Sequence, residues 1–325
     1  MQKKISIIIP LYNAEKYIEK CLLSIFNNKI IFDCEIILID DCSTDRSLSI
    51  AKNLLENQKN ISYSILINDK NLGSALTRQK GLNIAIGKYV IFIDSDDYVE
   101  SDYLEKLYIN AELYNADIMG CSVVSEFKNY SKIYPEYLPE DLNEFKIQLF
   151  TNKIHAWLPA KLFNLNFIKN NKLFFEPNLN IYEDLIFLIR CLSYKPKVKS
   201  INLVLYHYVQ RQSSYMNSKI RLQKAQQMED SINFIVKYLE LSDSNNVLSY
   251  IASKKLDVKS KIIFLGDFKT IKSYINKWPE TLNVLKESKI SKYKKIILSR
   301  INCNIYLTFL LIKLYKFAKK FKIKK

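Results

Sequence analysis

Residues 88–98 read Lys-Tyr-Val-Ile-Phe-Ile-Asp-Ser-Asp-Asp-Tyr, and this stretch decides the fold. Its apolar part, Tyr89 to Ile93, is a continuous β-branched and aromatic run, which is the pattern of a strand buried on both faces of a sheet. The run ends at Asp94, Asp96 and Asp97. Carboxylates at the end of a buried strand need a cation, hydrogen-bond donors or water, because burying an unpaired carboxylate is costly. The alternative is an ordinary polar turn, since Asp and Ser are common turn residues.

Strands and helices alternate before this stretch. The apolar patterns predict strands at 5–9, 34–39 and 63–67 and helices at 14–27, 43–57 and 74–85, with Ser43 or Thr44 as the cap of the second helix. This alternation predicts an α/β fold with a mostly parallel central sheet flanked by helices. The carboxyl ends of parallel strands meet at one edge, where ligands bind. We therefore expect Tyr12-Asn13, Asp40-Asp41 and the acids at 94–97 to converge.

The composition narrows the class of protein. The chain has 325 residues, of which 48% are hydrophobic, with 5 Gly and 7 Pro, so a disordered chain and a turn-dense β fold are both disfavoured. Its six cysteines form no Cys-x-x-Cys pair, which favours a reduced compartment. No signal peptide precedes the first strand, and we expect a cytoplasmic protein.

The formal net charge of +16 predicts an anionic partner. A composition shift near residue 216 predicts a helical region at 216–325, and Glu287 is the only acid in the last forty residues. Near the end, apolar residues recur at three- and four-residue steps opposite lysines, which predicts a basic amphipathic helix; the apolar positions are Leu307, Leu310, Leu311, Leu314, Phe317, Ala318 and Phe321. Its apolar run is too short to span a bilayer, so we expect it to lie on the anionic inner face of the membrane. Packing on the catalytic domain is the alternative, and no nucleic-acid module accompanies the charge.

Four ordered motifs resemble the nucleotide-sugar-binding half of family 2 glycosyltransferases, which have the GT-A fold. They are Ile-Ile-Ile-Pro-Leu-Tyr-Asn at 7–13, Ile-Asp-Asp-Cys-Ser-Thr-Asp at 39–45, Asn71-Leu-Gly with Arg78 and Gly81, and Ile-Asp-Ser-Asp-Asp at 93–97. The resemblance covers residues 1–215. It implies a donor half at 1–100 and an acceptor half at 101–215.

The resemblance implies an inverting transfer of a sugar from a nucleotide donor, expected to be UDP-linked, to a hydroxyl of a cell-surface glycan or a lipid-linked precursor. It implies that Asp96 ligates Mg²⁺ or Mn²⁺, and a cation held by one or two carboxylates would neutralise the leaving diphosphate. Asp94 would orient the ribose or the donor sugar, and Asp41 would accept a hydrogen bond from the base. The other implied donor-binding residues are Pro10, Tyr12, Asn13, Asn71, Gly73, Arg78 and Ser95.

Four positions leave questions open. Cys42 stands where the family usually has Gly, and a positive φ there would strain the backbone. Arg78 offers fixed donors for phosphate, but a surface salt bridge is the alternative. Asp97 is either a further ligand or a helix cap, and Asp40 either holds its turn or contacts the ligand.

On the acceptor side, Ile-Tyr-Glu-Asp at 181–184 resembles the family's Glu-Asp motif. This implies Asp184 as the catalytic base and Glu183 as an acceptor-binding partner, because an attacking hydroxyl must lose its proton; helix capping is the alternative. Trp157 and Lys161 match a stretch that lines the acceptor site, although an interface aromatic and a surface lysine would look the same. His207 and Arg211 are candidates for the diphosphate, and a histidine packed on tyrosines is the alternative to the first.

Two other classes remain open from sequence. A phospho-accepting receiver domain also gathers acids at strand ends, but its paired acids would follow the first strand, and here they follow the second. A noncatalytic glycan- or membrane-binding module on a transferase scaffold is the other, and the presence of both Asp96 and Asp184 argues against it.

Overall fold

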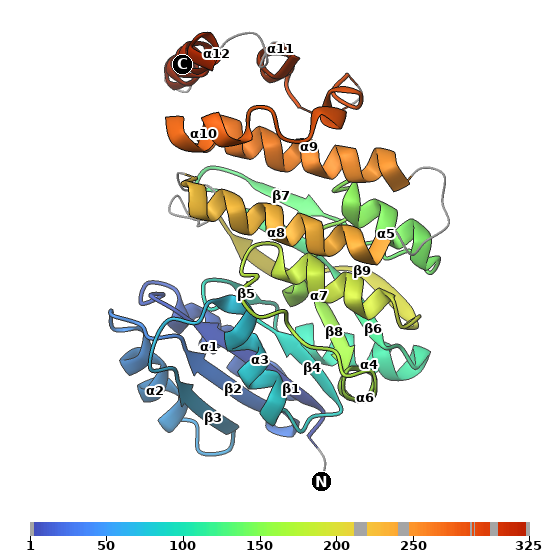
Figure 1. Ribbon diagram of the computed structural model, residues 1–325. Coiled ribbons are helices and arrows are strands. Elements are labelled where there is room, and N and C mark those ends of the chain that lie inside the picture. Colours follow the sequence, from blue (N-terminus) through green and yellow to red (C-terminus); the bar gives the residue numbers. More distant parts are fainter. Residues whose placement is uncertain are drawn as a thin grey trace. The chain divides into compact units, whose positions relative to one another are not determined.

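The computed structural model describes residues 3–210, 220–239, 247–286, 288, 290–299 and 305–322. The chain divides into two compact units, Met1–Arg211 and Gln212–Lys325, and each is described by itself. The first unit is an α/β unit and the second is helical (Figure 1).

The first half of the α/β unit is a parallel sheet in the order β3-β2-β1-β4. Its strands are β1 (Ile5–Leu11), β2 (Glu35–Asp40), β3 (Ser62–Ile67) and β4 (Tyr89–Phe92). All four residues of β4 are buried, as its apolar run predicts. Because β1 lies between β2 and β4, the turns that follow these three strands share one edge, which confirms the predicted convergence of the strand ends.

Helices cover both faces of this sheet, which explains why β1, β2 and β4 are buried along nearly their whole length, whereas the edge strand β3 is largely exposed. The helices are α1 (Ile18–Phe26), α2 (Ser47–Glu56) and α3 (Ser74–Ile84). Residues of α1 and α2 share a core with Ile7 and Ile9 of β1. The helix α3 packs on the opposite face, where a Cβ at Gly81 would lie 2.6 Å from Ile8. Gly81 therefore permits this close approach.

The predicted cap of α2 is wrong. The helix begins at Ser47, and the Asp45 carboxylate accepts hydrogen bonds from the Ser47 backbone N–H at 2.9 Å and from its hydroxyl. Ser43 and Thr44 instead bond to Asn13 in the turn after β1, at 3.1 and 2.8 Å. These contacts join the first two turns of the shared edge.

The second half of the unit extends the sheet with mixed strands in the order β4-β8-β6-β9-β5, with β7 beside β6. The strands are β5 (Tyr98–Val99), β6 (Ile118–Glu126), β7 (Ser131–Tyr134), β8 (Lys161–Asn164) and β9 (Val198–Val209). The helices are α4 (Tyr103–Tyr114), α5 (Leu142–Phe150), α6 (Leu165–Asn170) and α7 (Glu183–Leu192). The strand β8 runs antiparallel to both β4 and β6, so it joins the two halves of the sheet.

The C-terminal unit contains α8 (Leu222–Leu239), α9 (Val247–Leu265), α10 (Phe268–Tyr274), α11 (Lys292–Ser299) and α12 (Ile305–Lys322). Ile312 of α12 is 1% exposed in a core shared with α9, α10 and α11, whereas Leu310 and Leu314 are 52% and 54% exposed. The expected single apolar face of α12 is thus divided between a packed side and an exposed side. The side chains of Leu307, Phe317, Ala318 and Phe321 lie outside the described set. No helix in the described ranges is long and apolar enough to cross a membrane.

Candidate active site

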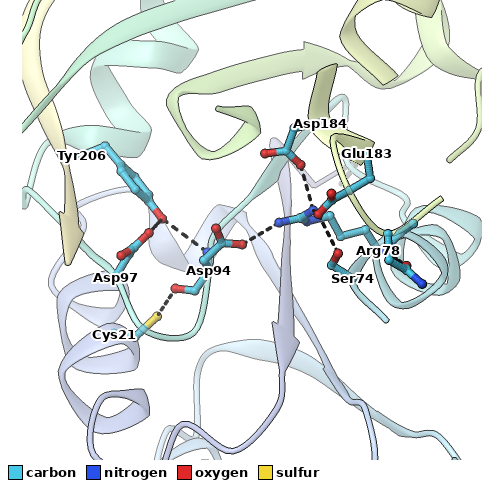
Figure 2. Close-up of polar contacts among 10 residues, drawn as sticks. Cys21, Ser74, Arg78, Asp94, Asp97, Glu183, Asp184 and Tyr206 are labelled. Carbon is cyan, nitrogen blue, oxygen red and sulfur yellow. Dashed lines mark hydrogen bonds and ion pairs between the residues drawn. The ribbon is translucent and has the colours of Figure 1, made fainter. Parts of the chain in front are cut away.

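A buried arginine joins Asp94 of the acidic turn to two adjacent carboxylates far along the chain, Glu183 and Asp184 (Figure 2). The Arg78 side chain projects from α3 and is 4% exposed. One of its terminal nitrogens lies 2.8 Å from Asp94 Oδ1, and the other lies 3.0 Å from Glu183 Oε1 and 2.9 Å from Asp184 Oδ1. The predicted base, Asp184, and Asp94 of the acidic turn therefore contact the same guanidinium group. Ser74 adds a 2.6 Å hydrogen bond to Glu183.

Charge and burial act against each other in this cluster. Burial alone would lower the pKa of Arg78, but Asp184, Asp94 and Glu183 outweigh it and raise that pKa above its ordinary value. Burial raises the pKa of Asp184 to about 7, with Arg78 opposing the rise and Glu183 and Asp94 adding to it. A carboxyl group with a pKa near neutrality is suited to accept a proton at physiological pH.

Hydrogen bonds from residues of β9 hold the turn after β4 in place. Asp97 is 1% exposed and accepts hydrogen bonds from the Tyr206 hydroxyl at 2.6 Å and the Val209 N–H at 2.8 Å. Burial, followed by the charge of Asp94, raises the pKa of Asp97 well above its usual value. Tyr206 also accepts from the Asp94 N–H at 3.4 Å. Asp97 is thus neither an exposed ligand nor a helix cap; it attaches the turn to β9.

The side-chain oxygens of Asp94, Ser95 and Asp96 are ligands of the kind that a hard divalent cation binds. Asp96 is partly buried, Ser95 is buried, and Asp94 is 28% exposed with Oδ1 on Arg78. Among the described residues no group of three or more His, Cys, Asp or Glu could hold a metal ion by itself. A cation here would need ligands from the substrate, as Mg²⁺ commonly has when it binds phosphates through one or two carboxylates.

The turn after β2 is organised around Asp41. Its two oxygens accept from the Asn68 side chain at 2.8 Å and from the N–H groups of Leu72 and Gly73 at 2.8 and 2.9 Å. Gly73 has φ +82°, and a Cβ there would lie 2.4 Å from Asn180. These contacts shape the 68–73 loop, and the hydrogen bond that Asp41 is expected to accept from a base would add to them.

Other expected donor residues line the same edge. Tyr12 is 48% exposed, Asn13 and Asn71 are exposed, and Pro10 is partly buried in β1. Asp40 accepts from the Ser43 N–H at 3.2 Å, while its buried Oδ1 has no hydrogen-bond partner among the described residues. Asp40 therefore holds its turn through one carboxylate oxygen, and its Oδ1 could accept a hydrogen bond from a further donor.

Two bulky residues adopt left-handed backbone conformations next to these acids. Cys42 has φ 64°, so the loop keeps the conformation that a glycine would favour. Tyr182, directly before Glu183 and Asp184, has φ 63° at the start of α7. A non-glycine residue in this conformation costs about 1–3 kcal/mol, so the surrounding contacts must hold both residues in place.

Lys161 does not lie where an acceptor contact would be. It is 0% exposed, and its ammonium bonds to Glu136 at 2.7 Å and to the carbonyl groups of His155 and Trp157 at 3.2 and 3.1 Å. All three N–H donors of the Lys161 ammonium are used within the protein. The expected acceptor contact of Lys161 is therefore wrong, and the residue has a structural role. Trp157 is partly buried and accessible.

His207 is held between two glutamates. Its ring nitrogens lie 2.7 Å from Glu100 and 3.1 Å from Glu126, and its ring stacks on Tyr98 with 4.2 Å between centroids. This matches the histidine-on-tyrosine alternative, and contact with a diphosphate stays a prediction. Arg211 lies outside the described residues.

Sequence reasoning missed Tyr206, Tyr208 and Asn180. Tyr206 and Tyr208 are two residues apart on β9, so both side chains point to the same face of the sheet. On that face Tyr206 contacts Asp97 of the acidic turn. The two-residue spacing of the tyrosines was the available signal. Nothing in the sequence indicated that Asn180 packs over Gly73.

The comparisons agree with this architecture. Over 97% of this chain, the structure resembles the crystal structure of S. aureus TarS 1-349 in complex with UDP-GlcNAc, with a TM-score of 0.64 and 17% identity; 92% of that chain is covered. At this identity the likeness shows the fold alone, which is the expected GT-A fold. Residues 6–179 match the family model "Glycosyl transferase family 2". This is more than half of the chain, and the chain belongs to glycosyltransferase family 2.

Two curated relatives are similar over much of the chain. The chain is 29% identical over 277 residues to the putative glycosyltransferase EpsH of Bacillus subtilis (strain 168), which covers 82% of this chain and 78% of EpsH. It is 32% identical over 221 residues to the poly(ribitol-phosphate) beta-glucosyltransferase of Bacillus spizizenii, covering 66% of this chain and 33% of that protein.

Proposed function

We propose that this protein is an inverting glycosyltransferase that moves a sugar from a UDP-linked donor to a hydroxyl of a cell-surface glycan or its lipid-linked precursor. The observation that carries the proposal is the Arg78 cluster, which brings Asp184 to the same guanidinium as Asp94. An inverting displacement needs a base on the acceptor side and charge neutralisation on the leaving-group side. Similarity to the poly(ribitol-phosphate) beta-glucosyltransferase of Bacillus spizizenii supports a surface polymer as the acceptor.

In the proposed mechanism, the exposed ring of Tyr12 and the loop held by Asp41 bind the nucleotide. Asp96, with the second oxygen of Asp94, would hold Mg²⁺ or Mn²⁺, which when bound neutralises the charge that develops on the diphosphate. Asp184 accepts the proton of the acceptor hydroxyl at its carboxylate as the hydroxyl oxygen bonds to the anomeric carbon. The bond from that carbon to the diphosphate oxygen breaks at the same time, and the nucleoside diphosphate leaves. Arg78 favours the ionised form of Asp184 and orients it, and Glu183 holds Arg78 and Ser74 in place.

Donor and metal binding can be tested by thermal stability. With Mn²⁺ present, the matching nucleotide sugar is expected to stabilise the protein by about 2.7 kcal/mol at a hundred times its dissociation constant, or roughly 5 °C. EDTA and Asp96→Asn should remove most of this shift, because both remove the cation that links protein and diphosphate. The shift is measured by differential scanning fluorimetry across a panel of UDP-, GDP- and CMP-sugars.

Asp33→Asn is the matched control, since Asp33 is an exposed acid just before β2, at the end opposite the acidic edge. It should keep the full shift. Equal stabilisation of the wild type and Asp96→Asn would contradict the metal assignment. Hydrolysis of the stabilising donor by the wild-type protein would exclude a noncatalytic binding module.

The C-terminal unit carries a second part of the proposal, attachment to an anionic membrane surface. After Glu287 the sequence contains Lys and Arg residues and no acid. Among the side chains of α12 that the structure describes, Tyr306, Leu310, Lys313 and Leu314 are exposed, so apolar and cationic groups occur together there. Such a surface gains from both acyl-chain contact and anionic headgroups.

Replacing Leu310 and Leu314 together by Glu should abolish most binding to vesicles that contain phosphatidylglycerol. Both side chains are more than half exposed, so the fold should persist while apolar contact is lost and charge repulsion is added. Co-sedimentation is the measurement, with at least a tenfold weaker partition expected. Leu113→Glu, at a 71% exposed site of α4, is the control and should bind normally. Equal binding to phosphatidylcholine vesicles would contradict the role of charge.

A further inference from the structure

Asn180 supplies a hydrogen bond that α3 does not supply at its own N-terminus. The residue at the N-cap position is Gly73, which has no side chain to accept a hydrogen bond. The side-chain Oδ1 of Asn180 accepts from the Ala75 N–H at 3.4 Å, and its Nδ2 donates to the Leu72 carbonyl at 3.5 Å. Asn180 therefore takes the place of the cap residue, although it lies 105 residues further along the chain than Ala75.

The Asn180 amide also packs directly on the backbone at Gly73. A Cβ at residue 73 would lie 2.4 Å from Cγ and Oδ1 of Asn180 and 2.5 Å from its Nδ2. The N–H groups of Leu72 and Gly73 meanwhile donate to Asp41 at 2.8 and 2.9 Å. The loop that enters α3 is thus held by Asp41 through its N–H groups and by Asn180 through a carbonyl and close packing.

A second set of contacts attaches the other end of the segment 180–184 to the same helix. Ser74 and Arg78 are four residues apart on α3, so they lie on one face of it. Ser74 donates to Glu183 at 2.6 Å, and Arg78 contacts Glu183 at 3.0 Å and Asp184 at 2.9 Å (Figure 2). The segment is therefore attached to α3 at both of its ends.

The backbone between these two attachments is strained. Tyr182 has φ 63°, a left-handed conformation that is unfavourable for a residue with a Cβ. Such a conformation persists only where the surrounding contacts hold it, and the contacts of Asn180 and Glu183 do so from either side. Without the Asn180 contacts Tyr182 would be able to relax, and Asp184 follows only two residues later.

We propose that Asn180 is a positioning residue, which caps α3, holds Tyr182 in its left-handed conformation and thereby keeps Asp184 against Arg78. The importance of this position for catalysis rests on the proposed function, in which Asp184 is the base. A base must lie within hydrogen-bond reach of the proton that it takes, so a small displacement of Asp184 lowers the rate.

A double-mutant cycle tests the link between Asn180 and Asp184 without an assay of activity. The free energy of unfolding in urea is measured for the full-length wild type, Asn180→Ala, Asp184→Ala and the double variant. The two effects should not add, because Asn180 has no carboxylate to hold against Arg78 once Asp184 is replaced. Additive effects would overturn the proposal.

Asn164→Ala is the matched control for this cycle. The Asn164 side chain caps α6 by accepting hydrogen bonds from the N–H groups of Asn166 and Phe167 at 2.9 and 3.2 Å. Its replacement also removes an asparagine cap, but from a helix that does not carry Arg78 or Asp184. The effects of Asn164→Ala and Asp184→Ala should add.

Kinetics test whether the link matters for the reaction. Hydrolysis of the stabilising donor, in which water takes the place of the acceptor hydroxyl, is followed by the release of UDP. Well above pH 7, Asn180→Ala should lower kcat about ten- to hundredfold, with a much smaller change in the donor KM. The ring-opening step is not involved, and a cap that served the fold alone would leave both constants unchanged in the folded variant.

The pH profile provides a second kinetic readout. The pKa of Asp184 is raised to about 7, so kcat/KM of the wild type should fall below that pH, and Arg78 opposes the rise. Loss of the Arg78 contact in Asn180→Ala should raise this pKa further and move the acidic limb to higher pH by about one unit. Asn180→Asp, which keeps an oxygen for the Ala75 N–H, should recover most of the rate measured well above pH 7.

Three kinetic results would overturn the proposal. They are a wild-type rate and limb in Asn180→Ala, a lower rate without a shift of the limb, and an equal change of both in Asn164→Ala. A wild-type protein that hydrolyses no nucleotide sugar would remove the proposed function instead. The unfolding cycle would then still decide whether Asn180 positions Asp184.

Discussion

Asp184→Asn is expected to lower kcat by about 10²- to 10⁴-fold, the usual contribution of a positioned general base, while donor affinity changes little. The asparagine keeps the size of the side chain and can still meet Arg78, but it cannot take the acceptor proton. The measurement is the initial rate of sugar transfer, together with calorimetric titration of the donor. An active Asp184→Asn variant would exclude Asp184 as the base.

The pH dependence gives this prediction a separate readout. The pKa of Asp184 is raised to about 7, so the base is ionised above that pH and protonated below it. We therefore expect kcat/KM of the wild type to fall about tenfold per pH unit below pH 7, since kcat/KM reports groups of the free enzyme. This acidic limb should be absent from the residual activity of Asp184→Asn.

Glu183→Gln serves as the comparison, because Glu183 also touches Arg78 and precedes Asp184 in α7. It should keep the acidic limb and lose less activity than Asp184→Asn. An unchanged limb in Asp184→Asn would assign the titration to another group.

Arg78→Gln is expected to destabilise the protein by about 3–5 kcal/mol, the range for removing one partner of a buried ion pair. Arg78 is 4% exposed and is the cation between Asp94, Glu183 and Asp184. Without it, three carboxylates repel one another at a site with little water. The measurement is urea unfolding followed by circular dichroism, with Arg46→Gln as control. Arg46 is 80% exposed in its pair with Glu15, and such surface pairs are worth about 0–1 kcal/mol.

The deficit of Arg78→Gln should depend on pH in a defined direction. Arg78 opposes the rise in the pKa of Asp184, so loss of the cation raises that folded-state pKa further, and the folded variant binds more protons than the unfolded chain does. Its stability therefore falls as pH rises, and the difference from wild type should be larger at pH 8 than at pH 5. A deficit that is small, or that grows as the pH falls, would contradict the ion-pair account.

Local patterns were sufficient for the framework of the donor half. The apolar run at Tyr89 to Ile93 predicts a doubly covered strand, and β4 is buried throughout. Strand ends at Asp40-Asp41 and Asp94 were predicted to meet because parallel neighbours align their carboxyl ends, and β1, β2 and β4 do so. The four motifs in this half also predicted the family correctly.

The acceptor half was less readable, because its strands are short, mixed in direction and paired over long separations. The antiparallel β8 lies between β4 and β6, and no pattern within 161–164 indicates either neighbour. Prediction of α12 was limited in the same way. Helical spacing identified its apolar residues, but it did not indicate that Ile312 packs inward while Leu310 and Leu314 are exposed.

The sequence by itself determined the buried strands, the acidic strand ends and the family, because each depends on neighbours two to four residues apart or on residue type alone. Only the tertiary structure decided that Arg78 is surrounded by Asp94, Glu183 and Asp184, and that Lys161 is buried beneath Trp157. The physical reason is that charge and burial depend on distance in space. Arg78 on α3 and Asp184 on α7 come into contact only in the folded unit. No local sequence pattern indicates that contact.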